Sequence, residues 1–139
     1  MRRFWLAVVC LVMTACAGAD KQAGCVFSNP PSEELLIDRL GHLEIVDAET
    51  GEVAAYDTRG DPVLEGGQPL AIWAEFDIPT RVRVCVLEAG EGRDPSFNNE
   101  ITFSDQVDTL LIGRYDIGTY RLLISIDGTL VKTLQFSVR

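Results

Sequence analysis

The stretch that decides the fold lies at residues 116–139 and reads DIGTYRLLISIDGTLVKTLQFSVR. Apolar side chains occupy every second position of residues 120–126, which is the period-2 signature of a strand with one face on a core. A second run of this kind covers residues 129–138. Asp127 and Gly128 lie between the two runs, and this dipeptide is a strong hairpin signal. The sequence therefore predicts a β-hairpin at the end of the chain.

The length of the hairpin loop decides which residues of the second run face the core. A two-residue loop pairs Ile126 with Thr129. It leaves four large apolar residues outside: Leu130, Leu134, Phe136 and Val138. A three-residue loop that ends at a left-handed Gly128 keeps this larger set inside. We therefore predict the three-residue loop.

Further strands precede this hairpin at a spacing of roughly ten residues. The clearest alternation lies at residues 70–77 and 81–88. Shorter runs are found at residues 42–47, 52–57, 100–103 and 107–112. Short strands with turn residues between them and no long helix are typical of an all-β sandwich. We expect an antiparallel sandwich of about seven strands in a single domain at residues 42–139.

Charge excludes some classes of partner. The chain of 139 residues has 21 acidic and 12 basic side chains, which gives a net charge of −9. A surface this acidic repels phosphate backbones, so we expect no nucleic-acid partner. The sequence contains no basic amphipathic helix of the kind that lies on anionic membranes.

The N-terminus has the layout of a secretory signal peptide. Arg2 and Arg3 form a short positive region, residues 4–13 are apolar, and small residues follow at 14–19. The apolar run is too short to cross a bilayer core, which requires about 20 residues in a helix.

The tetrapeptide Met13-Thr14-Ala15-Cys16 resembles the lipobox of bacterial lipoproteins. The resemblance implies a signal peptide at residues 1–15 and acyl chains, including palmitate, on Cys16. It also implies a membrane as partner and a location in the cell envelope. In a host with two membranes, Ala17 implies the outer membrane, facing the periplasm. The alternative is cleavage after Ala19, which releases a soluble secreted protein.

Residues 16–41 then form a tether. Residues 17–31 are small, polar and contain Pro. Residues 32–41 fit a short helix with Ser32 as N-cap, and an extended segment at residues 35–37 is the alternative.

The four cysteines leave one pair for the mature domain. Cys10 leaves with the signal peptide and Cys16 is the lipid site. Cys25 and Cys85 remain, and two cysteines in an oxidising compartment are expected to form a disulfide.

Residues 116–122, DIGTYRL, resemble the D-x-G-x-Y-x-C pattern of immunoglobulin-like domains. The resemblance implies that Tyr120 is the tyrosine corner, whose hydroxyl bonds to upstream backbone. Leu122 replaces the Cys of that pattern, so the similarity is to a generic bacterial immunoglobulin-like or fibronectin-III-like sandwich.

The same resemblance places the third, sixth and seventh strands in one sheet. Cys85 would then neighbour Leu123 and Val131 on an outer, partly apolar face. We expect the N-terminal segment, with residues 35–37, to cross this face and to be fixed there by the disulfide.

No catalytic, metal or cofactor site is indicated. The chain has one histidine, His42, and lacks a G-x-S-x-G motif. The acidic loop near residues 88–100 lacks EF-hand spacing. Four residues are candidate partner contacts: Trp73, Phe97, Leu123 and Val131.

We therefore expect a non-enzymatic envelope lipoprotein that serves as a binding or structural module, with an envelope protein or a glycan as partner. The alternatives are a secreted carbohydrate-binding or inhibitory module and a hydrolase that uses loop carboxylates.

Overall fold

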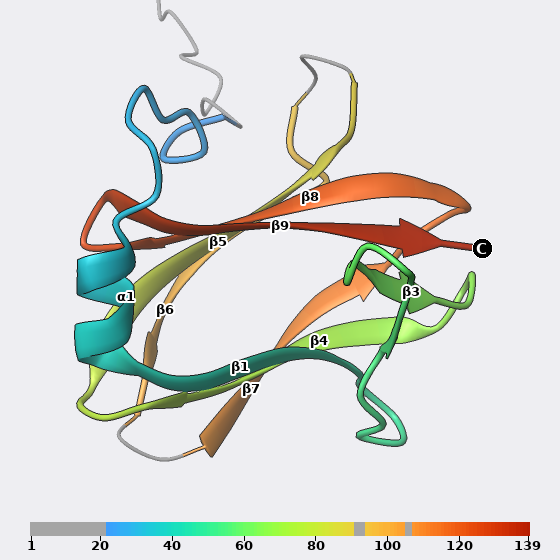
Figure 1. Ribbon diagram of the computed structural model, residues 1–139, viewed down its shortest axis with the longest axis horizontal. Helices are drawn as coiled ribbons and strands as arrows, with labels where there is room; N and C mark the ends of the chain where they lie inside the picture. Colours follow the sequence, from blue (N-terminus) through green and yellow to red (C-terminus); the bar gives the residue numbers. More distant parts are fainter. Residues whose placement is uncertain (1–21, 91–93, 105–106) are drawn as a thin grey trace, which may run out of the picture.

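Two stacked β-sheets make up the computed structural model, which describes residues 22–90, 94–104 and 107–139 (Figure 1). The smaller sheet has the order β1 (Leu40–Asp47), β4 (Pro69–Phe76) and β7 (Val107–Arg114). The larger sheet has the order β2 (Ala55–Tyr56), β3 (Pro62–Leu64), β9 (Thr129–Val138), β8 (Gly118–Ile126), β5 (Thr80–Glu88) and β6 (Phe97–Phe103). One helix, α1 (Glu33–Arg39), lies within these described ranges.

The predicted all-β sandwich is confirmed, with nine strands in the described ranges in place of about seven. β2 falls within the predicted run at residues 52–57, whereas β3 was not predicted, because it is too short to produce a readable alternation. All strand pairs are antiparallel except β3 with β9, which is parallel. Inward side chains of both sheets form one core, whose largest fully buried members include Phe76, Phe103 and Phe136.

Tyr120 is held as the sequence predicts. Its hydroxyl donates a hydrogen bond to the backbone carbonyl of Asp116 at 2.9 Å. Its ring stacks on Phe136, with the centroids 5.3 Å apart, and meets Tyr115 edge-on at 5.0 Å. The hydroxyl of Tyr115 donates to the carbonyl of Ile112 at 2.6 Å. These bonds fasten the 115–117 crossing between the two sheets to the core.

The three-residue loop predicted for the β8–β9 hairpin was wrong. Ile126 pairs with Thr129, and both Asp127 (φ 48°) and Gly128 (φ 82°) are left-handed, as a two-residue type I′ turn requires. The apolar set is kept inside by a bulge. Ser125 pairs with Leu130 and Ile124 with Lys132, so one extra residue restores the inward phase of Leu134, Phe136 and Val138.

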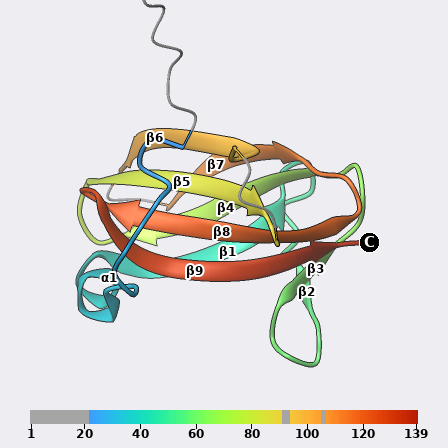
Figure 2. The same ribbon diagram turned by 90° about the horizontal axis from the view of Figure 1, so that it is seen from above.

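The disulfide between Cys25 and Cys85 is confirmed, with Cα atoms 5.9 Å apart. The N-terminal segment crosses the outer face of the larger sheet, as Figure 2 shows. Phe27 joins a small apolar cluster there with both cysteines, Leu123 and Leu130. The N–H of Ser32 donates to the carbonyl of Leu130 at 2.8 Å at the far end of this crossing.

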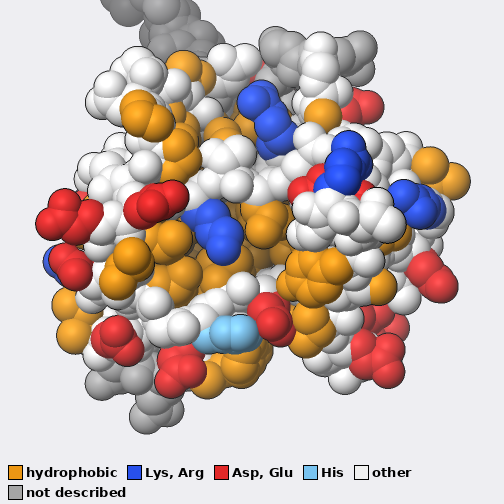
Figure 3. Space-filling view, in the orientation of Figure 1, with side chains coloured by type: hydrophobic (Ala, Val, Ile, Leu, Met, Phe, Trp, Pro, Cys, Tyr) orange, Lys and Arg blue, Asp and Glu red, His pale blue; other side chains and the backbone are white. Residues whose placement is uncertain are grey.

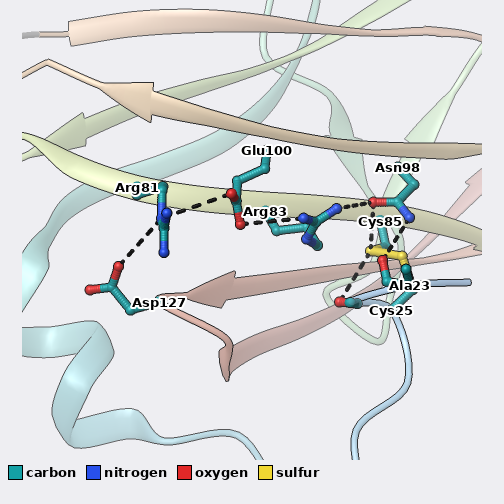
Figure 4. A network of polar contacts seen from close by, with 9 residues as sticks. Ala23, Cys25, Arg81, Arg83, Cys85, Asn98, Glu100 and Asp127 are labelled. Carbon is teal, nitrogen blue, oxygen red and sulfur yellow. Dashed lines mark hydrogen bonds and ion pairs between the residues drawn. A yellow bond between two sulfur atoms is a disulfide. The ribbon is translucent and has the colours of Figure 1, made fainter.

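Polar contacts hold the same segment beside the disulfide (Figure 4). Arg83 Nη1 donates to Asn98 Oδ1 at 2.8 Å, and Asn98 Nδ2 donates to the carbonyl of Ala23 at 3.0 Å. Glu100 lies between two arginines, 3.4 Å from Arg83 and 3.8 Å from Arg81. The start of the described chain is therefore fixed to β5 and β6 by both covalent and polar links.

The helical alternative for residues 32–41 is the one observed. The Ser32 side chain accepts a hydrogen bond from the N–H of Leu35, Glu33 and Glu34 lie in the first turn, and Arg39 lies in the last. Leu35 and Leu36 pack against the main core, so the expectation that residues 35–37 lie across the outer face was wrong. Among the described residues, no helix is long and apolar enough to cross a bilayer.

The predicted signal peptide and the lipid site at Cys16 lie outside the described residues.

Candidate functional site

The outer face of the smaller sheet presents nine side chains in three rows across β1, β4 and β7. The register defines the rows as His42, Glu75 and Val107; Glu44, Trp73 and Thr109; and Val46, Ala71 and Leu111. Because side chains alternate along each strand, the intervening residues Ile45, Ile72 and Leu110 face the core. Trp73 thus occupies the centre of the outer face.

Trp73 is half-buried although it points away from the core. The ring of His42 meets the indole edge-on, with the ring centroids 5.0 Å apart. His42 Nε2 lies 3.1 Å from Glu44 Oε1, so imidazole and carboxylate are in close polar contact beside the indole. One wall of the site is therefore a fixed polar group placed against an aromatic ring.

The turn after β1 forms the opposite wall. Asp47 Oδ1 accepts hydrogen bonds from the N–H groups of Glu49 at 2.7 Å and Thr50 at 2.9 Å. The bond from Thr50, followed by that from Glu49, holds the pKa of Asp47 below its ordinary value. Val53 returns to form a bridge with Val46. At the far end, Arg114 of β7 donates to Glu49 at 3.0 Å, which ties the turn to the opposite edge of the sheet.

Between these walls lies a pocket of about 560 Å³. Its lining residues are His42, Glu44, Val46, Asp47, Ala48, Gly51, Val53, Trp73 and Thr109. Two carboxylates and one imidazole line it, and within the described ranges neither Lys nor Arg does. The volume is in the usual range for small-molecule sites, about 300–1,000 Å³.

Exposed apolar side chains surround the pocket. Val53 and Val107 are 47% exposed and Leu111 is 57% exposed. Seen from the edge of the sandwich, the histidine lies at the lower rim of the molecule with hydrophobic and acidic side chains beside it (Figure 3). An apolar surface with a few fixed polar groups is the usual composition of a binding site.

The other three candidate contacts do not join Trp73. Phe97 is half-buried at the start of β6 and packs against the edge of the main core. Leu123 lies on the outer face of the larger sheet, as predicted, but the N-terminal segment covers it. Val131 was predicted on that outer face and is instead 1% exposed in the main core, because the β9 bulge reverses its direction.

His42, Glu44, Val53 and Thr109 are site residues that the sequence did not single out. Period-2 alternation assigns each of them to a face of a strand. It does not show that β1 and β7 flank β4, because strand order depends on long-range pairing.

Within the described ranges, no group of three or more His, Cys, Asp or Glu side chains is placed to hold a metal ion. Glu100, one of the carboxylates near the 89–99 loop, is paired with Arg81 and Arg83.

No protein-family model and no curated protein matches the chain. Among solved structures, it is similar to a superoxide reductase (neelaredoxin) from Ignicoccus hospitalis, with 11% sequence identity and a TM-score of 0.45. The match covers 78% of this chain and 89% of that chain.

This comparison contradicts the expected non-enzymatic envelope module. That expectation rested on the lack of catalytic motifs and on the lipobox-like tetrapeptide, and a chain matched by its structure carries the name of an enzyme. A TM-score of 0.45 supports no transfer of activity to this chain. A function has to be argued from the pocket itself.

Proposed function

We propose that the Trp73 pocket binds a small organic ligand that has an apolar ring and a positive charge. The observation that carries the proposal is a pocket of about 560 Å³ that the half-buried indole of Trp73 lines together with the carboxylates of Glu44 and Asp47.

The electrostatics of the pocket favour a cation. The face of an indole attracts positive charge, which contributes about 0.5–2 kcal/mol depending on desolvation. The carboxylates of Glu44 and Asp47 add attraction of the same sign, and the net charge of −9 raises the local concentration of cations around the molecule. An anionic ligand would meet two negative groups in the pocket.

The apolar lining favours a ring or a short chain next to the charge. Val46, Val53 and Ala48 provide aliphatic surface on the side opposite His42. Burying apolar surface contributes about 25 cal/mol per Å². A ligand that combines both features uses both walls of the pocket.

We further propose that the domain acts outside the cytosol. The Cys25–Cys85 disulfide supports this, because such bonds persist in oxidising compartments. The lipobox-like tetrapeptide favours attachment through lipid on Cys16, and cleavage after Ala19 is the alternative. Mass spectrometry of the N-terminal peptide from expressing cells distinguishes an acylated N-terminal Cys16 from an unmodified N-terminal Asp20.

Binding can be followed through Trp73 itself. The chain has two tryptophans, so the Trp5→Phe variant of the full chain leaves Trp73 as the single reporter. Benzyltrimethylammonium, benzyl alcohol and benzoate are probes that share a phenyl ring and differ in charge. We expect the cation to bind at least tenfold more tightly than benzoate, with the alcohol between them.

Two matched variants test the origin of this preference. Glu44→Gln should reduce the preference for the cation over the alcohol about fivefold. Glu75→Gln removes a carboxylate from the same face that does not line the pocket, and should leave the preference unchanged. Equal affinities for all three probes, or unchanged calorimetric binding in Trp73→Ala, would contradict the proposal.

A further inference from the structure

One edge of the smaller sheet is open beside the pocket. In the described part of the chain, β7 pairs with β4 alone and ends the sheet. Its three outer side chains are Val107, Thr109 and Leu111, so a small residue lies between two exposed apolar ones. Thr109 shares a cross-strand row with Trp73 and Glu44 and lines the pocket. A side chain that crosses the edge at Thr109 therefore reaches the indole of Trp73 directly.

We propose that an extended polypeptide segment adds to the open edge of β7 as a fourth strand, with an Arg or Lys side chain that crosses Thr109 into the Trp73 pocket. The inference rests on the proposed function and names the ligand as part of another polypeptide. Addition of a strand to a sheet edge is an established mode of peptide recognition, in which backbone hydrogen bonds supply affinity and side-chain pockets supply specificity.

The backbone of β7 is oriented for this pairing. The N–H of Thr109 donates to the Oδ1 of Asp108 at 2.8 Å, so this group is satisfied by the neighbouring side chain and not by β4. In an antiparallel pair, alternate residues direct both backbone groups to the same side. Val107 and Leu111 therefore turn their N–H and C=O groups to the open edge together with Thr109, and an incoming carbonyl can replace the Asp108 side chain.

Distances agree with this arrangement. Neighbouring strands lie about 4.8 Å apart, so an added strand would lie about 10 Å from β4. The half-buried Trp73 side chain lies on β4, directly across from Thr109 of β7. Thr109 is the smallest of the three outer side chains of β7, so it obstructs access to the indole least. An Arg or Lys side chain that crosses Thr109 can reach the indole of Trp73, and Glu44, one strand further on β1, attracts its charge across the pocket. In the added strand, the residues two positions before and after this Arg or Lys would lie beside Val107 and Leu111. The expected segment therefore has five residues, with an apolar residue at each end, Arg or Lys in the middle and any residue at the other two positions.

In the described ranges, the edge strand β6 of the larger sheet pairs with β5 alone and lies away from the Trp73 pocket, whereas the free sides of β1 and β9 are partly covered. β1 has an irregular register near His42 and is bridged at Val46 by Val53. The edge of β9 is covered by β3 at Ser137 and Val138. Bulges, charged side chains and covering segments are the devices by which proteins block edge pairing. The regular part of β7 up to the bulge near Gly113 has two exposed apolar side chains and, among the described residues, no covering segment, and its one charged side chain, Asp108, accepts the Thr109 N–H that an added strand would take over.

The test uses the full chain with Trp5→Phe and the peptide acetyl-TVTRTVT-amide as the probe. We expect binding at least tenfold tighter than that of N-acetylarginine amide, and a loss of at least tenfold when glutamate replaces the central arginine. A β-pair uses the backbone groups on one side of the peptide. One analogue is therefore N-methylated at the arginine and both valines, and a second at the threonines that flank the arginine. One analogue should lose at least tenfold in affinity while the other stays within threefold of the parent.

A protein variant checks the apolar flank. Leu111→Thr should weaken the peptide several-fold and leave benzyltrimethylammonium binding unchanged, because Leu111 does not line the pocket. Ile78→Thr, which changes an apolar side chain of similar exposure elsewhere, should affect neither probe. If both N-methylated analogues bind like the parent, or the parent binds no better than N-acetylarginine amide, strand addition is refuted. If benzyltrimethylammonium also fails to bind, the proposed function itself is refuted.

Discussion

At the scale of single residues, the hydroxyl of Tyr120 holds the chain between β7 and β8. Tyr120→Phe keeps the ring stacked on Phe136 and removes the hydrogen bond to the carbonyl of Asp116. We expect the free energy of unfolding to fall by about 1–2 kcal/mol, measured by urea denaturation. Tyr56→Phe removes a hydroxyl from an exposed side chain and should be neutral. Equal stability of both variants would contradict a role for the corner.

Tyr115 makes stability depend on pH in the alkaline range. Burial raises the pKa of its hydroxyl, and the nearby Tyr120 raises it further. An unfolded tyrosine has a pKa of about 10. The contribution of the neutral hydroxyl is therefore complete below pH 10 and is lost as the pH rises from there toward the folded pKa.

Tyr115→Phe should flatten this alkaline loss of stability, measured by urea midpoints between about pH 9 and pH 11. The free energy of unfolding of the variant should still fall with pH, but less steeply, because the pKa of Tyr120 is also raised, mainly by burial. An identical slope in wild type and variant would show that another group causes the loss.

At the scale of elements, the β8–β9 hairpin depends on Gly128. Its φ of +82° is strained for any residue with a side chain, although a Cβ there would meet no atom within 4 Å. Gly128→Ala should therefore cost about 1–2 kcal/mol through backbone strain alone. Gly41→Ala is the matched control, because that glycine is not left-handed and its Cβ would have ordinary contacts at 3.6 Å. Thermal unfolding of both variants separates strain from the mere addition of a methyl group.

The elements that the sequence predicts well are those whose alternation is uninterrupted. β4, β5 and β8 show apolar residues at every second position, and their inward residues form the core. The β9 run was predicted with Leu134, Phe136 and Val138 correctly inward but with the wrong turn, and Leu130, also predicted inward, lies in the outer cluster, because a bulge and a longer loop restore the phase at different residues. Val131, the extra residue, was consequently assigned to the wrong face.

The candidate site was predictable only in part for a similar reason. The alternation of residues 70–77 shows that Trp73 faces away from the core. The pocket around it arises from pairing of β1 with β4, of β4 with β7, and of Val46 with Val53. Each pairing joins residues that are distant in sequence, and no local pattern specifies it.

At the scale of the whole molecule, the Cys25–Cys85 bond closes a separation of 60 residues and fixes the N-terminal segment to β5. In the chain-entropy account, a loop of this length contributes about 4 kcal/mol to stability. The double variant Cys25→Ala and Cys85→Ala should lose an amount of this order, measured by urea denaturation. Wild type measured under reducing conditions should show a similar loss, and a change below 1 kcal/mol in both would contradict the account.

The Trp73 pocket lies on the outer face of the sheet of β1, β4 and β7. The N-terminal segment and its disulfide lie on the larger sheet, on the opposite side of the sandwich (Figure 1). The two features are therefore separable. Loss of the disulfide should lower stability without changing the ratio of affinities for benzyltrimethylammonium and benzoate, as long as the titration is performed where the variant is folded.

The central claim is that ligands enter the pocket on the outer face of β1, β4 and β7. The most direct measurement is a ¹H–¹⁵N correlation spectrum of the labelled full chain during titration with benzyltrimethylammonium. We predict that the largest shifts occur at the Trp73 indole N–H and at the backbone amides of Glu44, Val53 and Thr109. Shifts centred instead on the outer face of β5 and β8, or no shift at Trp73, would contradict the claim.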